Sequence, residues 1–66
     1  MTNTKLLKAK IVENGYTQTQ LAHQMGISYQ TLNSKINNKI EFKASEIDTI
    51  CKLLKIVDMD EIFFCI

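Results

Sequence analysis

Apolar residues recur along the chain at intervals of three and four, the period expected when one face of an α-helix is buried. Four such stripes predict four helices, and their apolar positions are Leu6, Leu7, Ile11 and Val12; Leu21, Ala22 and Met25; Leu32 and Ile36; and Ala44, Ile47, Ile50, Cys51 and Leu54. A fifth, short helix is expected to open at residues 58–61 and to run toward Phe63. The pattern predicts an all-α fold of five short helices in a single domain over residues 1–66.

Polar residues and glycines between the stripes mark where the helices begin and end. Thr17 and Gln20 fit a capping box, since the Thr17 hydroxyl can accept the N–H three residues on while Gln20 reaches back. Ser28 is the expected N-cap of the third helix, and residues 58–61 repeat the capping-box pattern before the fifth. Gly26 ends the second helix, because glycine takes a left-handed conformation at little steric cost.

Composition supports a packed helical domain. Apolar residues make up 45% of the chain and charged residues 23%, with two glycines and no proline. This balance excludes a disordered tail and a turn-rich β-sandwich. No apolar run approaches the roughly 20 residues needed to cross a bilayer, and the N-terminus has no apolar signal core. We therefore expect no membrane association and a cytoplasmic location.

Charge is distributed unevenly, although the net charge is only +1. Residues 1–43 contain six lysines and two glutamates, a local charge of +4. Residues 44–66 contain two lysines and five acidic residues, a local charge of −3. A domain polarised in this way can present its basic half to an anion such as nucleic acid.

Residues 17–37 have the arrangement of a helix-turn-helix. The turn between the two short helices consists of a glycine, an apolar residue and a serine, at residues 26–28. Ala22 is small enough for the helices to approach closely, and the glycine can adopt the positive φ that the corner needs. Ile27 and Leu32 can fix the angle between the helices from within.

The segment TQTQLAHQMGISYQTLNSKINNK, residues 17–39, resembles the helix-turn-helix of the lambda-repressor and Cro family. The resemblance extends from the Glu-Asn-Gly-Tyr helix end before it to the Asp-Glu-Ile-Phe segment near the C-terminus. It implies a lambda-repressor-like, sequence-specific double-stranded DNA-binding regulator of transcription that occupies an operator, such as a short phage Cro-like regulator. The location it implies is the cytoplasm of a bacterial host cell, in association with the nucleoid.

The chain departs from the family pattern in three respects. Many members have Trp or Leu where Lys35 stands, and usually Gly where Asn38 stands. Members often carry Glu and Arg at the positions of Ile36 and Ile11, so a buried ion pair would here be replaced by an apolar contact. Such a replacement is often neutral or stabilising when both charges leave together.

The residues expected to contact DNA lie on the outward face of the third helix. At 100° per residue, Gln30, Ser34 and Asn37 point away from its buried positions. Helix-turn-helix domains read base edges mainly with the first residues of this helix. Gln30 can pair bidentately with adenine for about 1–3 kcal/mol of discrimination, and Tyr29 or Thr31 could meet a thymine methyl group.

The resemblance adds residues on either side of the third helix. It implies that Gln18 braces this helix and touches phosphate, and that Asn37 and Lys39 contact the DNA backbone. Since the chain has no arginine, only Lys35 or Lys39 could replace the usual contact between arginine and guanine. A site led by A·T and methyl contacts is therefore predicted. With the two helix caps, the expected DNA-contacting set is Thr17, Gln18, Ser28, Tyr29, Gln30, Thr31, Ser34, Asn37 and Lys39.

The C-terminal segment 62–66 is more apolar than one turn of helix can bury. Ile62 or Phe63 should cover the core, and the remainder is a candidate association surface. One short recognition helix rarely gives enough affinity alone, so we expect a homodimer through this segment, reading half-sites about 34 Å apart. The rival interpretation is a phage antirepressor or modulator that keeps the fold and uses the same patch to bind a repressor protein.

Catalysis and metal binding are not expected. A single histidine with no nucleophile and no orienting group around it argues against an enzyme. Two cysteines and one histidine lack zinc spacing, and the acidic run 58–61 lacks the glycine and the ligand number of a calcium loop. We therefore predict no cofactor and no metal, with His23 as an ordinary surface residue and Cys51 as a core residue.

Overall fold

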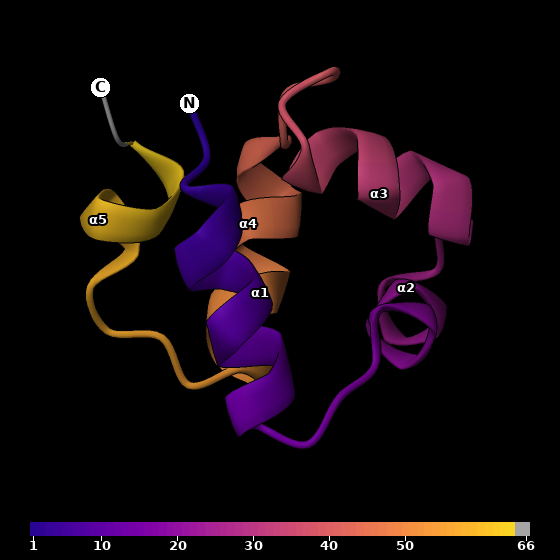
Figure 1. Cartoon of the computed structure of the whole chain (residues 1–66), viewed down its shortest axis with the longest axis horizontal. Coiled ribbons are helices and arrows are strands. Elements are labelled where there is room, and N and C mark those ends of the chain that lie inside the picture. The colour runs from indigo at the N-terminus through magenta and orange to yellow at the C-terminus, as the bar shows by residue number, and fades with distance from the viewer. Residues whose placement is uncertain (65–66) are drawn as a thin grey trace.

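Helices form at each of the five predicted places, and the structure is all-α (Figure 1). The computed structural model describes residues 1–64. The helices there are α1 (Thr4–Glu13), α2 (Gln18–Met25), α3 (Tyr29–Ile36), α4 (Ala44–Leu53) and α5 (Met59–Phe63). No strand occurs within residues 1–64, and no helix in this range is long and apolar enough to cross a membrane. The expected fold class is confirmed.

Hydrogen-bonded caps open α2 and α3 as predicted. Thr17 Oγ1 accepts the Gln20 N–H at 3.1 Å, and Gln20 Oε1 accepts the Thr17 N–H at 2.9 Å. Ser28 Oγ accepts the Thr31 N–H at 3.1 Å. The capping box expected at residues 58–61 is wrong, because the Asp58 side chain makes no cap hydrogen bond. With φ −106° and ψ 57°, Asp58 lacks the extended backbone that places a cap side chain over the first amides.

Left-handed residues end α2 and turn the chain after α3. Gly26 has φ +71° and Asn38 has φ +63°. Glycine adopts this conformation freely, and asparagine is among the few other residues that visit it routinely. Lys55, just after α4, has φ +54°, which its residue type did not indicate.

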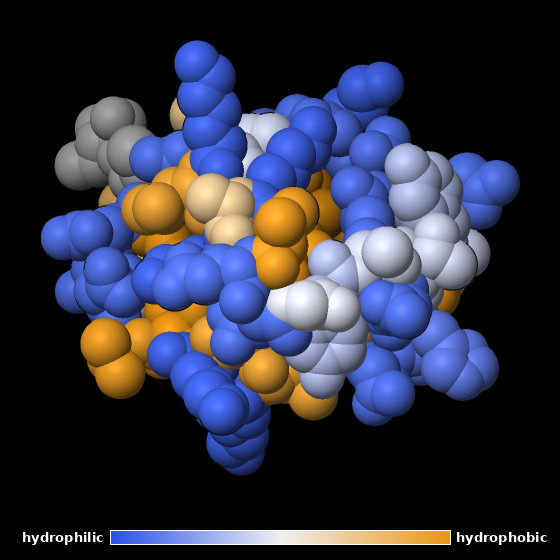
Figure 2. Space-filling view, turned by 60° about the horizontal axis from the view of Figure 1, so that its bottom comes forward, coloured by the Kyte–Doolittle hydropathy of each residue, from blue (hydrophilic) through white to orange (hydrophobic). Residues whose placement is uncertain are grey.

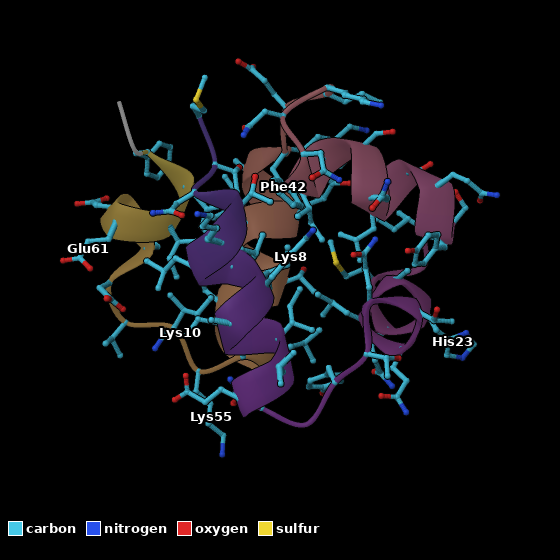
Figure 3. The ribbon with its side chains drawn as sticks, in the orientation of Figure 1. Lys8, Lys10, His23, Phe42, Lys55 and Glu61 are labelled. Atoms are coloured by element: carbon cyan, nitrogen blue, oxygen red, sulfur yellow. The ribbon has the colours of Figure 1, made fainter. Side chains whose placement is uncertain are left out.

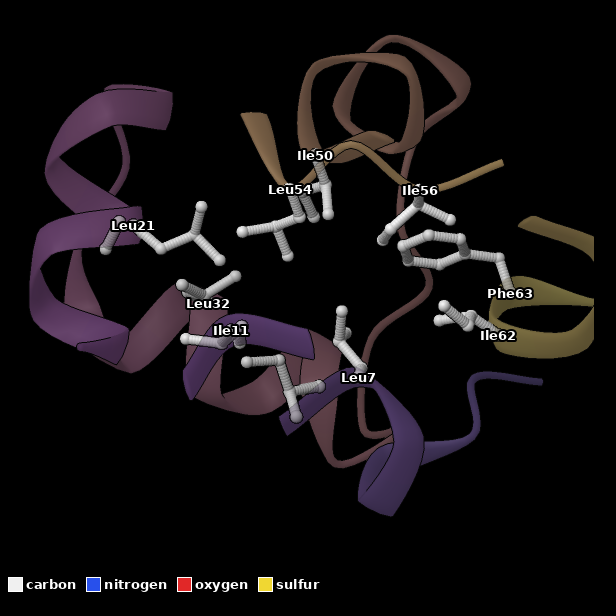
Figure 4. Packing of buried hydrophobic residues seen from close by; sticks show 11 residues of the cluster. Leu7, Ile11, Leu21, Leu32, Ile50, Leu54, Ile56, Ile62 and Phe63 are labelled. Atoms are coloured by element: carbon white, nitrogen blue, oxygen red, sulfur yellow. The ribbon is translucent and has the colours of Figure 1, made fainter. Parts of the chain in front are cut away.

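One hydrophobic core joins all five helices (Figure 4). Ile11 and Ile36 belong to this core and are 3% and 0% exposed. Members of the lambda-repressor and Cro family often carry an ion pair at these two positions, and here the pair is replaced by two buried isoleucines. Phe42 lies at its edge, with its ring edge-on to Phe63 at a centroid distance of 5.4 Å. The fully buried side chains of the core are Leu7, Leu21, Leu32, Ile36, Ile50, Leu54 and Ile62.

Two residues of the predicted apolar stripes, Val12 and Ala44, are exposed. Val12 is 74% exposed, because the buried line of α1 runs through Leu7 and Ile11, and Val12 lies 100° further round the helix. Ala44 is exposed because it is the first residue of α4, ahead of the part of that helix that faces the core. The buried faces of α1 and α4 are therefore narrower than the apolar pattern predicts.

The N-terminal segment is tied to the C-terminal end of α3. The Thr2 N–H donates to Asn38 Oδ1 at 2.8 Å, and Asn38 Nδ2 donates to the Thr2 carbonyl at 2.9 Å. Thr4 Oγ1 donates to the Ile36 carbonyl at 2.7 Å. Asn38 therefore supplies both a left-handed turn and a side-chain amide that pairs with backbone, which a glycine could not do.

Candidate nucleic-acid interface

Helices α2 and α3 form a braced pair joined by the turn at residues 26–28. The Ile27 N–H donates to the Ala22 carbonyl at 3.1 Å, which holds the turn against the end of α2. Ala22 is 2% exposed and Ile27 packs partly buried against the core. Gln18 Nε2 donates to Asn33 Oδ1 at 3.1 Å, so the start of α2 is linked directly to the middle of α3. This hydrogen bond is the bracing contact that the family resemblance implied for Gln18, whereas the phosphate contact implied for the same residue stays a prediction.

The predicted DNA-contacting residues come from the start of α2, from α3 and from the loop after it. Most of them are exposed, and Gln18, Thr31 and Ser34 are half-buried. On the face shown in Figure 2, the side that carries α2 and α3 is mostly white to blue, whereas most of the orange patches lie over the centre and the left, between blue side chains. We call the set of predicted DNA-contacting residues the α2–α3 polar face. It comprises Thr17, Gln18, Ser28, Tyr29, Gln30, Thr31, Ser34, Asn37 and Lys39.

Hydrogen bonds divide the side chains of this face into engaged and free groups. Ser28 Oγ donates to Thr31 Oγ1 at 2.9 Å, which fixes the Thr31 hydroxyl. Asn37 Nδ2 donates to the Asn33 carbonyl and to Asn33 Oδ1 at 2.9 and 3.2 Å, so its amide turns back on α3. Within residues 1–64, the side chains of Tyr29, Gln30, Ser34 and Lys39 make no hydrogen bond, and Ser34 is the half-buried one among them. Tyr29 and Gln30, in the first turn of α3, and Lys39, in the loop after it, are therefore the groups most open to a ligand.

Lys35 is not part of the exposed surface, and the expectation that it could contact guanine is wrong. It is only 5% exposed, and its Nζ lies 2.5 Å from Glu46 Oε1. On the helix, Lys35 adjoins the buried positions Leu32 and Ile36, so its side chain leaves α3 on the core side. The sequence signal that could have predicted this burial was the Trp or Leu that many members of the lambda-repressor and Cro family have at this position. Lys39 is the remaining cation of the α2–α3 polar face.

Glu46 is a carboxylate held ionised by its neighbours. Burial opposes its charge and is the largest single effect on its pKa. The hydrogen bonds from Lys35 and from the Lys43 N–H, together with the charges of both lysines, outweigh burial. The pKa of Glu46 therefore lies below its ordinary value, so this carboxyl group is ionised at neutral pH.

Acidic residues of the C-terminal half lie in different places, since Glu46 pairs with Lys35 of α3 whereas Glu61 lies away from this face (Figure 3). Glu61 extends from α5 at the opposite edge of the molecule from His23, which extends outward from α2 (Figure 3). Within residues 1–64, no group of three or more His, Cys, Asp or Glu side chains is placed to hold a metal ion.

A second feature is an apolar groove of about 350 Å³ between α4 and α5. Phe64 on its rim is 55% exposed, whereas Ile62 and Phe63 are buried in the core. The predicted apolar segment 62–66 is thus divided, and Cys65 and Ile66 lie outside the described residues. Burial, with a smaller effect of the Asp48 charge, raises the pKa of the Cys51 thiol in the groove. The α4–α5 groove is lined by Phe42, Ala44, Ile47, Asp48, Cys51, Met59 and Phe64.

Comparison with known proteins gives one family and no function. Residues 3–65 match the family described as Protein of unknown function (DUF739). No curated protein matches the chain.

Proposed function

We propose that this chain, which belongs to the DUF739 family, is a sequence-specific double-stranded DNA-binding regulator of transcription that inserts α3 into the major groove. The observation that carries the proposal is the pair of free, exposed side chains of Tyr29 and Gln30 at the start of a helix braced from behind by α2. Helix-turn-helix proteins present base-reading residues at this place.

Each part of the α2–α3 polar face has a chemical role in this complex. Gln30 offers one donor and one acceptor to adenine N7 and N6, and Tyr29 can meet a thymine methyl group. Ser28 fixes the Thr31 hydroxyl, which leaves the Thr31 methyl group for an apolar contact. The first amides of α2, beyond the Thr17 cap, are free to bind a phosphate. Bound in this way, α2 sets the register in which α3 reads the bases.

The proposed site is led by A·T base pairs and has few phosphate contacts. The chain has no arginine, and Lys35 is committed to Glu46, so α3 has no free arginine or lysine for the bidentate contact to guanine. Lys39, three residues after the end of α3, is the exposed lysine of the α2–α3 polar face. We therefore expect a weaker salt dependence than that of a helix-turn-helix with several arginines on its DNA face.

We further propose that two copies associate through the α4–α5 groove. The groove is apolar and lies on different helices from the α2–α3 polar face, so occupation by a second copy leaves both α3 helices available. A two-fold dimer would read two half-sites about 34 Å apart and raise the affinity beyond what one short helix provides. This regulator would act in the cytoplasm, at the nucleoid of a bacterial host.

The test compares Gln30→Ala with Gln24→Ala on a duplex selected from a random pool by the wild type. Both substitutions shorten an exposed glutamine on a helix, but only Gln30 lies on the α2–α3 polar face. Loss of a bidentate contact worth about 1–3 kcal/mol should lower the preference for the selected site by about 5- to 150-fold in Gln30→Ala. Gln24→Ala should behave as the wild type, and equal effects of the two changes would contradict the proposal.

The α4–α5 groove also favours a second candidate function, in which the chain modulates a repressor by binding that protein. Under this alternative, Gln30→Ala leaves partner binding intact, whereas Phe64→Asp on the groove rim abolishes it. A wild type that selects no duplex sequence, together with this pattern of variants, would replace the DNA-binding proposal by the modulator.

A further inference from the structure

We propose that the buried Lys35–Glu46 pair is a positioning device for the loop at residues 37–43, and that it holds Lys39 where a DNA phosphate meets the end of α3. This inference rests on the proposed DNA-binding function for its last step, the phosphate contact. Its first step, control of the loop position, concerns the free protein and can be tested alone.

A single carboxylate oxygen connects both ends of the loop. Glu46 Oε1 lies 2.5 Å from Lys35 Nζ on α3, and it accepts the Lys43 N–H at 2.8 Å where α4 begins. The loop therefore starts from one helix and ends at another, and both attachments meet at one atom. Between them, the Lys39 N–H donates to the Ser34 carbonyl at 2.9 Å. Movement of Glu46 would release the loop at its α4 end.

The pair is more easily explained by geometry than by stability. Lys35 and Glu46 side chains are 6% and 15% exposed, so both charges lose much of their hydration on folding. A well-packed apolar pair in their place is often neutral or stabilising. Apolar contacts, however, hold over a range of positions, whereas a hydrogen-bonded ion pair fixes donor and acceptor within a few tenths of an ångström. What this pair adds is a defined loop position.

The loop position matters because α3 has no exposed cation of its own. The only lysine of α3 is the one buried against Glu46. Lys39 is exposed and follows the left-handed Asn38, so its direction is set by the turn that leaves α3. A lysine at a phosphate changes affinity and salt dependence but not base choice. Loss of the pair should therefore weaken binding without altering the preferred sequence.

The experiment compares two double variants that each remove one positive and one negative charge. Lys35→Met with Glu46→Leu removes the buried pair. Lys10→Met with Glu13→Leu removes a pair on α1, away from the α4–α5 groove, whose side chains are 28% and 67% exposed and whose charged atoms are 3.9 Å apart. Exchange of the Lys39 amide is measured in the free protein, and affinity for the selected duplex is measured against salt concentration.

The buried-pair variant should remain folded, exchange the Lys39 amide about tenfold faster, and lose about 0.9 from the slope of log K against log salt, the value of one phosphate contact. The same change in a Lys39→Gln background should leave the slope unaltered, because the contact is already gone. The surface-pair variant should match the wild type in amide exchange. Unchanged amide exchange in the buried-pair variant would overturn the inference, and so would a changed base preference.

The inference stays testable if the wild type selects no duplex or if the apolar double variant does not fold. If the wild type selects no duplex, the proposed function fails, but the Lys39 amide still tests control of the loop. If the apolar double variant does not fold, Lys35→Gln with Glu46→Gln takes its place, since two amides can keep the hydrogen bonds without charge. That variant should keep most of the protection of the Lys39 amide, and a full loss of protection would overturn the role of the hydrogen bonds.

Discussion

Replacing Asn38 with glycine and with alanine separates its two roles. Its backbone is left-handed, with φ +63°. Its side chain pairs with the Thr2 backbone through hydrogen bonds of 2.8 and 2.9 Å. Asn38→Gly keeps the conformation and removes only the side-chain contacts. Asn38→Ala removes the contacts and also forces an ordinary L-residue into the left-handed region.

The expected sizes follow from these contacts. A typical internal hydrogen bond contributes about 0.5–1.5 kcal/mol net, so losing two partly buried ones costs about 1–3 kcal/mol. In Asn38→Gly, part of this loss of stability is offset, because glycine lacks the steric cost that asparagine has at positive φ. Alanine should lose about 1–2 kcal/mol more than glycine, the cost of a Cβ in this conformation. The free energy of unfolding should therefore fall in the order wild type, Asn38→Gly, Asn38→Ala.

Urea unfolding followed by circular dichroism measures both differences, provided that the m-values stay equal. Asn37→Ala is the matched control, since the Asn37 amide is exposed and bonds only within α3. It should cost less than either change at Asn38. A glycine variant as stable as the wild type would refute the role of the Thr2 contact, and an alanine variant equal to the glycine variant would refute the backbone argument.

Other substitutions probe the core, the buried carboxylate and the groove. Leu32→Ala, at a fully buried side chain, should cost about 2–5 kcal/mol in urea unfolding, whereas Val12→Ala, at one 74% exposed, should cost less than about 0.5 kcal/mol; equal losses would contradict the packing. Because the folded pKa of Glu46 is lowered, the stability that its charge adds is complete above the ordinary value of 4.5 and is lost as pH falls through the folded pKa. The difference in free energy of unfolding between the wild type and Glu46→Gln should shrink as the pH is lowered. A difference that grows on acidification would contradict a lowered pKa of Glu46. Phe64→Asp should yield a monomer in sedimentation with unchanged helix content, and a persistent dimer would exclude the α4–α5 groove as the interface.

Local sequence signals were sufficient where neighbouring residues decide the structure. Thr17 and Ser28 satisfy amides within the next few residues, and Gly26 needs only its own backbone freedom. The helix ends, the turn between α2 and α3, and the all-α class could therefore be predicted. Asp58 failed as a cap because its own backbone is not extended, and its residue type did not indicate this conformation.

Long-range pairing accounts for what the sequence did not reveal at the candidate interface. Periodicity alone does not bury a lysine, and the partner of Lys35 stands 11 residues further on. The local sequence identifies Asn38 only as a turn residue, because its hydrogen-bond partner, Thr2, is 36 positions away in the chain. Both contacts restrain the C-terminal end of α3 and the loop after it, so they determine how the α2–α3 polar face is held rather than which residues compose it.

Selection from a random duplex pool, repeated at near-physiological and at higher salt, tests the central claim most directly. Contacts to base edges survive higher salt better than contacts to phosphate alone. The account predicts enrichment of an A·T-led palindrome at both salt concentrations, with half-sites about 34 Å apart. Binding that shows no sequence preference and disappears at higher salt would contradict it, because only the lysines would then be touching DNA.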